Sequence, residues 1–254
     1  MSIVKHIPNT ITLANLLCGC LAIIYTFYGD LIFAGILVGV AAVFDFLDGF
    51  AARMLKAYSD IGKDLDSLAD MVSFGVVPGF VMFKMLAWLT GSYYGNGVFA
   101  ALATGVSAWY PLAGIVIILF SALRLAKFNN DTRQTGGFIG LPTPANAILV
   151  CSLPLVFDFG QSYQLVNLVN APFITDGANL AIIACILSLL LITELPLFSL
   201  KFRSFGWKEN KTRFLYLAGC LMMFLIMGLP ALPLCIVLYI ATGVVQNIFL
   251  KKET

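Results

Sequence analysis

Residues 45–70 read DFLDGFAARMLKAYSDIGKDLDSLAD and place four regularly spaced aspartates, Asp45, Asp48, Asp66 and Asp70, in a strongly apolar chain. A carboxylate inside an apolar membrane span costs about 2.5–3.5 kcal/mol. Divalent cations offset that cost, because they prefer oxygen ligands and neutralise clustered acids. The stretch therefore predicts a metal site in a membrane protein, and an enzyme is the favoured interpretation.

The composition is that of a membrane protein. Hydrophobic residues make up 60% of the 254 positions and charged residues 11%, whereas a soluble domain carries about 25% charged residues. We expect one membrane domain over residues 1–254, with no signal peptide and no nucleic-acid partner. The six cysteines lie in apolar runs, without the spacing of a zinc site or a disulfide framework.

Apolar runs long enough to cross a bilayer predict an all-α, polytopic integral membrane helix bundle. The expected spans number about eight. They cover roughly residues 9–29, 31–54, 67–90, 99–126, 142–158, 178–200, 212–229 and 231–250.

Basic residues alternate with these spans. Of the 15 Lys and Arg, 14 lie at or between span ends on one side, and the exception is Lys84 inside the third span. By the positive-inside rule, both termini and all the basic loops are expected in the cytoplasm.

The four aspartates fall on two adjacent helix ends. Asp45 and Asp48 are three positions apart, and Asp66 and Asp70 are four apart, so each pair shares one helix face. A short loop joins the helices, so the pairs are expected to converge on one or two hard cations. Asp60 and Asp64 are expected in or beside the loop, in solvent.

Small and basic residues beside the acids suit a diphosphate. Gly49 and Ala52 leave space, Arg53 offers a planar donor group for phosphate, and Gly62 is expected to allow a tight turn.

Other interpretations of the acids stay open at this point. Intramembrane acids also serve ion or proton transporters, and acids near a span end can be ordinary interfacial residues. Gly35 and Gly39 form a GxxxG motif, which fits a close helix contact or a dimer face.

The spacing D-x2-D-G-x2-A-R-x8-G-x3-D-x3-D over residues 45–70 resembles the signature of the CDP-alcohol phosphotransferase family at all eight positions. Further segments resemble the type II phosphatidylserine synthases of bacteria within that family. These are residues 8–16 (PNTITLANL), 67–76 (SLADMVSFGV), 124–129 (RLAKFN, with Lys127 where Arg is more frequent) and 138–145 (FIGLPTPA).

The resemblance implies a core of six helices, with a catalytic region over about 5–200 and an added helix pair over about 212–250. It implies transfer of the phosphatidyl group from CDP-diacylglycerol to L-serine, or to another alcohol such as glycerol 3-phosphate or inositol phosphate. It also implies a homodimer in a bacterial-type inner membrane, with the active site on the cytoplasmic side.

The resemblance further assigns roles to residues. Two Mg²⁺ or Mn²⁺ ions would be held by Asp45, Asp48, Asp66 and Asp70, and Asp70 would also be the general base. The CDP part would contact Gly49, Ala52, Arg53 and Gly62. Candidates for serine or phosphate contacts are Lys63, Arg124, Lys127, Asn129 and Asn15. Asn15, in an apolar run, is expected to be buried and hydrogen-bonded.

Overall fold

The structure of the protein is a computed structural model, which describes residues 6–91, 105–130, 138–163, 175–197 and 206–250. Six of the basic residues used to predict the orientation lie outside these ranges: Lys5, Arg133, Lys201, Arg203, Lys251 and Lys252. Parts of the fourth and sixth predicted spans, residues 99–104 and 198–200, also lie outside them.

Helices dominate the described residues, and they form eight successive segments that correspond in order to the eight predicted spans. In chain order the elements are α1 (Ile7–Tyr28), α2 (Leu31–Met54), α3 (Asp60–Asp70), the π-helical turn η2 (Met71–Val76), α4 (Val77–Leu89), the 3₁₀ turn η4 (Val106–Leu112), α6 (Ala113–Asn130), α7 (Thr143–Tyr163), α9 (Gly177–Ile192), α10 (Trp207–Met227) and α11 (Ala231–Leu250). The third segment is continuous from α3 through η2 to α4, and η4 leads directly into α6.

The polytopic membrane class is confirmed. Among the described residues, four helices are long and apolar enough to cross a membrane: Ile7–Tyr28, Leu31–Met54, Asp60–Leu89 and Ser107–Asn130. Three further apolar stretches of helix among the described residues are shorter, namely Thr143–Phe157, Gly177–Ile192 and Ala231–Asn247.

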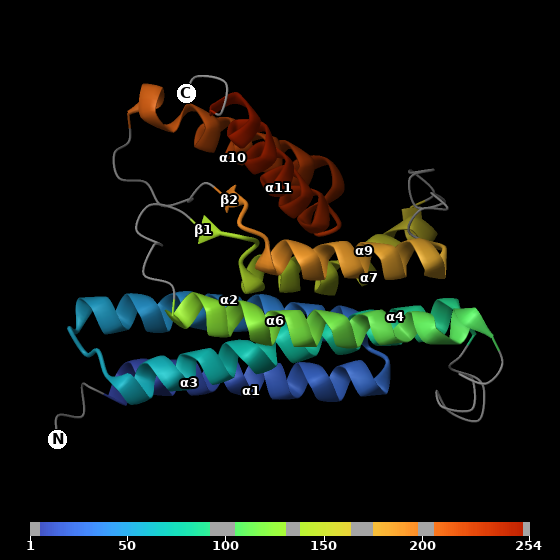
Figure 1. Ribbon diagram of the computed structural model, residues 1–254, viewed down its shortest axis with the longest axis horizontal. Coiled ribbons are helices and arrows are strands. Elements are labelled where there is room, and N and C mark those ends of the chain that lie inside the picture. The colour runs from blue at the N-terminus through green and yellow to red at the C-terminus, as the bar shows by residue number, and fades with distance from the viewer. Residues whose placement is uncertain (1–5, 92–104, 131–137, 164–174, 198–205, 251–254) are drawn as a thin grey trace.

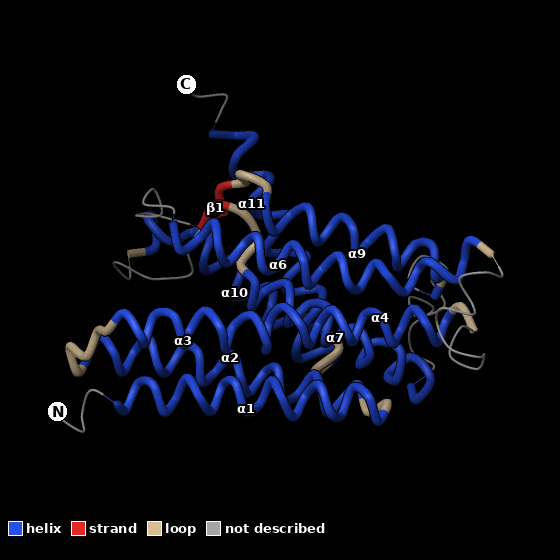
Figure 2. Tube along the Cα trace, turned by 60° about the horizontal axis from the view of Figure 1, so that its bottom comes forward, coloured by secondary structure: helices blue, strands red, loops and turns tan. Residues whose placement is uncertain are grey.

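The helices run nearly parallel to one long axis, except that α10 and α11 cross the others at an angle (Figure 1). The hairpin of α1 and α2 makes the most extensive helix pair, with α3 against α1 and α4 against α6. A second layer of α7 and α9 covers α2 and α6, and α11 packs on α7 (Figures 1 and 2). We call the end where α2 finishes and α3 begins the acidic end of the bundle.

Local sequence explains the helix ends on either side of α2. Gly29 adopts φ 90°, which closes α1, and Asp30 then caps α2 by accepting a hydrogen bond from the Phe33 amide. At the acidic end, Ser59 caps α3 by accepting from the Gly62 amide. The third helix therefore begins at Asp60, earlier than predicted. Asp60 and Asp64 lie in the first turns of α3, beside the loop, and both are exposed to solvent as predicted.

The GxxxG motif has an explanation within the chain at its first glycine. A Cβ at Gly35 would lie 2.4 Å from the carbonyl oxygen of Cys151, so the absence of a side chain lets α2 touch the backbone of α7. A Cβ at Gly39 would meet nothing within 4 Å. The homodimer stays a prediction.

A two-stranded antiparallel pair was not predicted. β1 (Phe138–Ile139) pairs with β2 (Pro196–Leu197), so the start of α7 is tied to the end of α9. The Gly140 amide donates to the Leu195 carbonyl, and the Leu141 amide to the Leu190 carbonyl. Strands of two residues carry no detectable alternation of polar and apolar positions, which is why the sequence pattern misses them.

Candidate metal and nucleotide site

Three of the four predicted aspartates converge at the acidic end. One carboxylate oxygen from each of Asp45, Asp48 and Asp66 lies within 4.8 Å of the other two. Asp45 and Asp48 come from α2 and Asp66 comes from α3, as the spacing predicted. Such a trio of oxygen ligands, on two antiparallel helices, can hold a hard divalent cation.

Asp70 lies beside this trio and makes a different contact. Its Oδ1 accepts a hydrogen bond from Asn15 Nδ2 on α1, at 3.2 Å. Asn15 is fully buried, as predicted, and Ser73 Oγ donates to its backbone carbonyl at 3.1 Å. The side chain of Asn15 therefore fixes one oxygen of Asp70, and the contact of Ser73 with the same residue joins α1 to η2.

Thr12 is a site residue that the sequence reasoning did not identify. It lies one helical turn before Asn15 on α1, and its hydroxyl is 2.6 Å from Asp48 Oδ2. Both Thr12 and Asp48 are buried. The three-residue spacing of Thr12 and Asn15 places two polar side chains on one face of an apolar helix, and this was the available signal.

A cavity of about 220 Å³ opens next to the acids, between α1, α2 and α3. Asp48 and Asp66 lie on its wall, and Thr12 lines it from α1. Every residue predicted to contact CDP lines it as well, together with Lys63: the set is Gly49, Ala52, Arg53, Gly62 and Lys63. The structure thus brings two metal-ligand candidates, a guanidinium and an ammonium to one cavity.

Gly62 contributes to this cavity in a way the sequence did not predict. It is not in a turn; it is the third residue of α3. A Cβ there would lie 2.9 Å from Ser59 Oγ and 3.0 Å from Asn9 Oδ1, so glycine makes room for the helix cap and for α1. Gly49 agrees with its prediction, because only the Arg53 guanidinium would lie within 4 Å of an added Cβ.

The structure separates the three candidates for serine or phosphate contacts in the segment 124–129, namely Arg124, Lys127 and Asn129. Arg124 is buried at 4% exposure, and its Nε donates to the Leu141 carbonyl at 3.3 Å. Lys127 reaches the Ile192 carbonyl at the end of α9, and Asn129 donates to Ser67 Oγ. None of these three residues lines the 220 Å³ cavity, although Lys63 Nζ contacts the Asn129 carbonyl from the cavity rim.

The sequence model of CDP-alcohol phosphatidyltransferases matches residues 5–175, which include all of these acids and the cavity beside them. The chain belongs to the CDP-alcohol phosphatidyltransferase family. The protein is therefore a membrane transferase, and membership of this family decides for an enzyme over a transporter.

Similar curated members of the family carry the name CDP-diacylglycerol--serine O-phosphatidyltransferase. The protein from Methanocaldococcus jannaschii is 30% identical over 246 residues, covering 95% of this chain and 94% of its own length. The one from Bacillus subtilis is 32% identical over 176 residues, covering 66% and 90%. The one from Helicobacter pylori strain J99 is 29% identical over 248 residues, covering 97% and 92%.

The acid cluster of this family member fits a divalent cation. Asp66 Oδ1 is buried and has no hydrogen-bond partner among the described residues. Buried carboxylate oxygens are normally paired, so an unpaired one facing two other carboxylates indicates a missing positive charge. Asp45, Asp48 and Asp66 would hold the cation, with Asp70 beside them.

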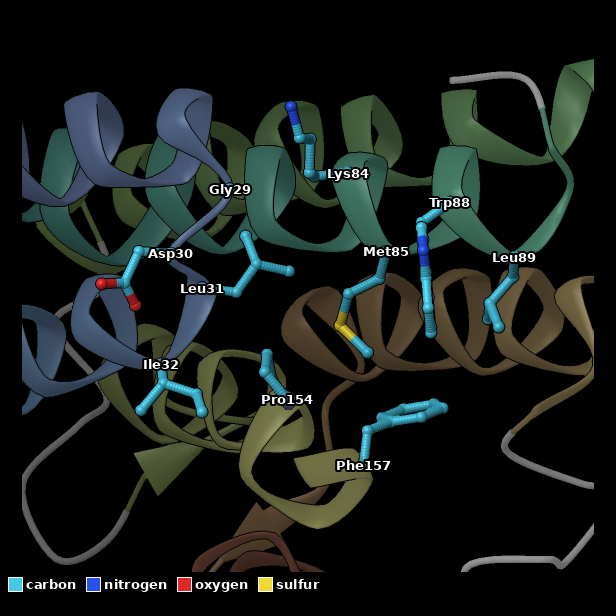
Figure 3. A pocket seen from close by; sticks show the side chains of 10 residues that line it. All are labelled: Gly29, Asp30, Leu31, Ile32, Lys84, Met85, Trp88, Leu89, Pro154 and Phe157. Atoms are coloured by element: carbon cyan, nitrogen blue, oxygen red, sulfur yellow. The ribbon is translucent and has the colours of Figure 1, made fainter. Parts of the chain in front are cut away.

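A larger cavity of about 390 Å³ lies at the opposite end of the bundle (Figure 3). Apolar side chains from α2, α4 and α7, among them Leu31, Met85 and Phe157, converge on it. The ammonium of Lys84 turns away from these side chains and contacts the Phe27 carbonyl at the end of α1, at 3.4 Å. This cavity is mostly hydrocarbon-lined, and none of the four aspartates of the signature lines it.

Proposed function

We propose that this transferase moves the phosphatidyl group of CDP-diacylglycerol to the hydroxyl of L-serine, giving phosphatidylserine and CMP. The single observation that carries the proposal is the match along 95% of the chain to a relative named for this reaction. The same name recurs for relatives from two bacteria. The cavity chemistry described above is compatible with a nucleotide diphosphate.

In this proposal the 220 Å³ cavity holds the CDP part of the lipid. The planar guanidinium of Arg53 can donate two parallel hydrogen bonds to phosphate oxygens. Lys63 adds a second positive charge. The small residues Gly49 and Ala52 leave room for the nucleotide beside α2. The position of the cavity, at the end of spanning helices, lets the diacyl chains stay in the lipid.

The four aspartates would hold a pair of Mg²⁺ or Mn²⁺ ions. Such a pair neutralises the diphosphate and stabilises the departing CMP. Thr12 orients Asp48 through its hydroxyl, and such outer hydrogen bonds set the direction of metal-binding carboxylates. Asn15 orients Asp70 in the same way, through its hydrogen bond to Oδ1.

Asp70 is proposed as the general base. The serine hydroxyl is a weak nucleophile at neutral pH and needs a positioned proton acceptor. Because Asn15 occupies Oδ1 of Asp70, the proton would pass to Oδ2. A bond then forms between the serine oxygen and the phosphorus of the phosphatidyl group, and the bond from that phosphorus to the CMP oxygen breaks.

The side chains of Arg124, Lys127 and Asn129 are proposed for the acceptor. Arg124 is the best placed of them, because it is buried on α6. Lys127 and Asn129 are retained as weaker candidates because both are exposed. All three side chains make contacts outside the 220 Å³ cavity.

The membrane setting is also proposed. The acidic end would face the cytoplasm of a bacterial-type inner membrane, where water-soluble serine meets the lipid. The support is the basic residues that the sequence gathers at one set of span ends. A homodimer is proposed from the family resemblance.

The test is CMP release by purified protein supplied with CDP-diacylglycerol and either Mg²⁺ or Mn²⁺. Serine, glycerol 3-phosphate and inositol phosphate are compared in parallel, with and without a chelator. Release that depends on serine and stops with the chelator is the expected result. Release with another acceptor alone would overturn serine as the substrate while leaving the family assignment intact.

A further inference from the structure

Two fully buried polar side chains lie outside the acid cluster and have no hydrogen-bond partner among the described residues. They are Ser121 on α6, at its Oγ, and Asn146 on α7, at both Nδ2 and Oδ1. Buried polar groups in proteins almost always have a partner, so two such side chains point to a ligand that the protein alone does not supply. Neither belongs to a sequence motif used above.

Ser121 lies slightly farther from the acidic end than the four aspartates. A Cβ at Gly75 would be 3.1 Å from Ser121 Cβ, so the two residues are in contact across η2 and α6. Gly75 follows Asp70 by five residues, which places it about 7 Å farther from the acidic end. Ser121 precedes the buried Arg124 by one turn on α6.

Asn146, on α7, lies at a similar distance from the acidic end as Ser121. α7 runs antiparallel to α2, and Cys151 of α7 touches Gly35 of α2. Asn146 is five residues nearer the acidic end than Cys151, and Asp45 is ten residues nearer than Gly35. At the helical rise of 1.5 Å, Asn146 is therefore about 7 Å below the level of Asp45.

The π turn η2 packs against both of the helices that carry these two side chains. It begins directly after Asp70, and it packs against both α6 and α7. Single π turns inside α-helices are frequent at functional sites. Asp70 is thus nearer the acidic end, and Ser121 and Asn146 lie farther from it, on two helices that contact the same turn.

We propose that Ser121 and Asn146 bind the amino-acid end of the acceptor, and that they select for a small zwitterion. The inference rests on the proposed function. The Asn146 amide offers one oxygen acceptor for the α-ammonium and one NH₂ donor for the α-carboxylate, so its two orphan atoms match the two charged groups of serine. The serine hydroxyl then extends upward to Asp70.

This assignment also accounts for selectivity against phosphorylated acceptors. A neutral amide and a hydroxyl pair well with a zwitterion that carries no net charge. A phosphate on glycerol 3-phosphate carries up to two negative charges, and the one buried cation near this place among the described residues, Arg124 one turn farther along α6, could balance only one of them. A site with buried polar groups rejects a ligand that leaves those groups unpaired.

The experiment compares Asn146→Leu with the unmodified protein. We expect the KM for serine to rise by tenfold or more, with the KM for CDP-diacylglycerol changed less than twofold. Serine should also lose its stabilising shift of the melting temperature measured in detergent. The matched control is Ser152→Ala on the same helix, whose buried Oγ already donates to the Leu149 carbonyl. That variant should leave both KM values unchanged.

Ser121→Ala provides a second reading if Asn146→Leu does not fold. It should raise the KM for serine in the same direction and leave the CDP-diacylglycerol KM alone. An unchanged serine KM in either folded variant, or an equal rise for both substrates, overturns the inference. If the unmodified protein releases no CMP with serine, the proposed function fails first, so the two failures are distinct.

Discussion

The hydroxyl of Thr12 lies 2.6 Å from Asp48 Oδ2, and it links the first helix to one carboxylate of the trio Asp45, Asp48 and Asp66. Because both side chains are buried, water does not compete for this hydrogen bond. Thr12→Val removes the hydroxyl and keeps the shape of the side chain. Loss of such an outer contact typically costs about 10–100-fold in metal affinity or activity, and we expect a loss in that range.

The measurement is the concentration of Mg²⁺ or Mn²⁺ needed for half-maximal CMP release. Thr12→Ser should restore most of the loss. Thr26→Val on the same helix is the matched control, because the buried Thr26 hydroxyl bonds only to the Ala22 carbonyl among the described partners. A metal requirement equal to that of the unmodified protein would show that Thr12 does not orient Asp48.

Asp70→Asn keeps the size of the side chain and removes the proton acceptor. Loss of a general base lowers the rate by about 10²–10⁴-fold. Since Asp45, Asp48 and Asp66 still form the trio, metal binding should weaken much less than turnover. CMP release gives the rate, and calorimetric titration with Mn²⁺ gives the affinity. Full activity in this variant would remove Asp70 from the role of base.

Arg53→Lys keeps one positive charge beside the cavity but loses the planar pair of donors. The loss of one charge-assisted hydrogen bond corresponds to about a tenfold change in affinity. The KM for CDP-diacylglycerol should rise by that factor, and the KM for serine should stay near its original value. Arg213→Lys, in α10, is the control. A change confined to the serine KM would contradict the assignment of Arg53 to the nucleotide.

Gly35→Ala should destabilise the protein, because the new Cβ would overlap the Cys151 carbonyl oxygen and force α2 away from α7. Overpacking of this kind costs about 1–3 kcal/mol. Gly39→Ala, in the same motif but facing open space, should be neutral or slightly stabilising. Thermal unfolding in detergent compares the two. Equal melting temperatures would mean that the helices separate freely at this contact.

Much of the site was predictable because its chemistry is encoded in local spacing. Asp45 and Asp48 share a face of α2 by their three-residue separation, and the short loop brings Asp66 opposite them. Contacts between distant helices are not encoded in this way. Thr12 meets Asp48 across 36 positions, and Asn15 meets Asp70 across 55. Only the packing of α1 on α2 and α3 brings these groups together.

Other differences arise at helix ends and at glycines. The sequence places a turn at Gly62, whereas the cap from Ser59 begins α3 earlier and turns Gly62 into a point of close approach. Lys127 and Asn129 share a segment with Arg124. They differ in direction around the helix, so only Arg124 is buried. A short motif records which residues are present, and the orientation of the helix then decides which of them are buried.

The π turn η2 sets the rotation, about the helix axis, of the side chains of α3 relative to those of α4. Each residue of an α-helix advances the side chains by about 100° around the axis. Removing one residue from Met71–Val76 would therefore swing Asp66 and Asp70 about a quarter of a revolution away from Asp45 and Asp48, while α4 stayed seated in the bundle. The length of this one turn thus keeps the acids of the third span aimed at those of the second.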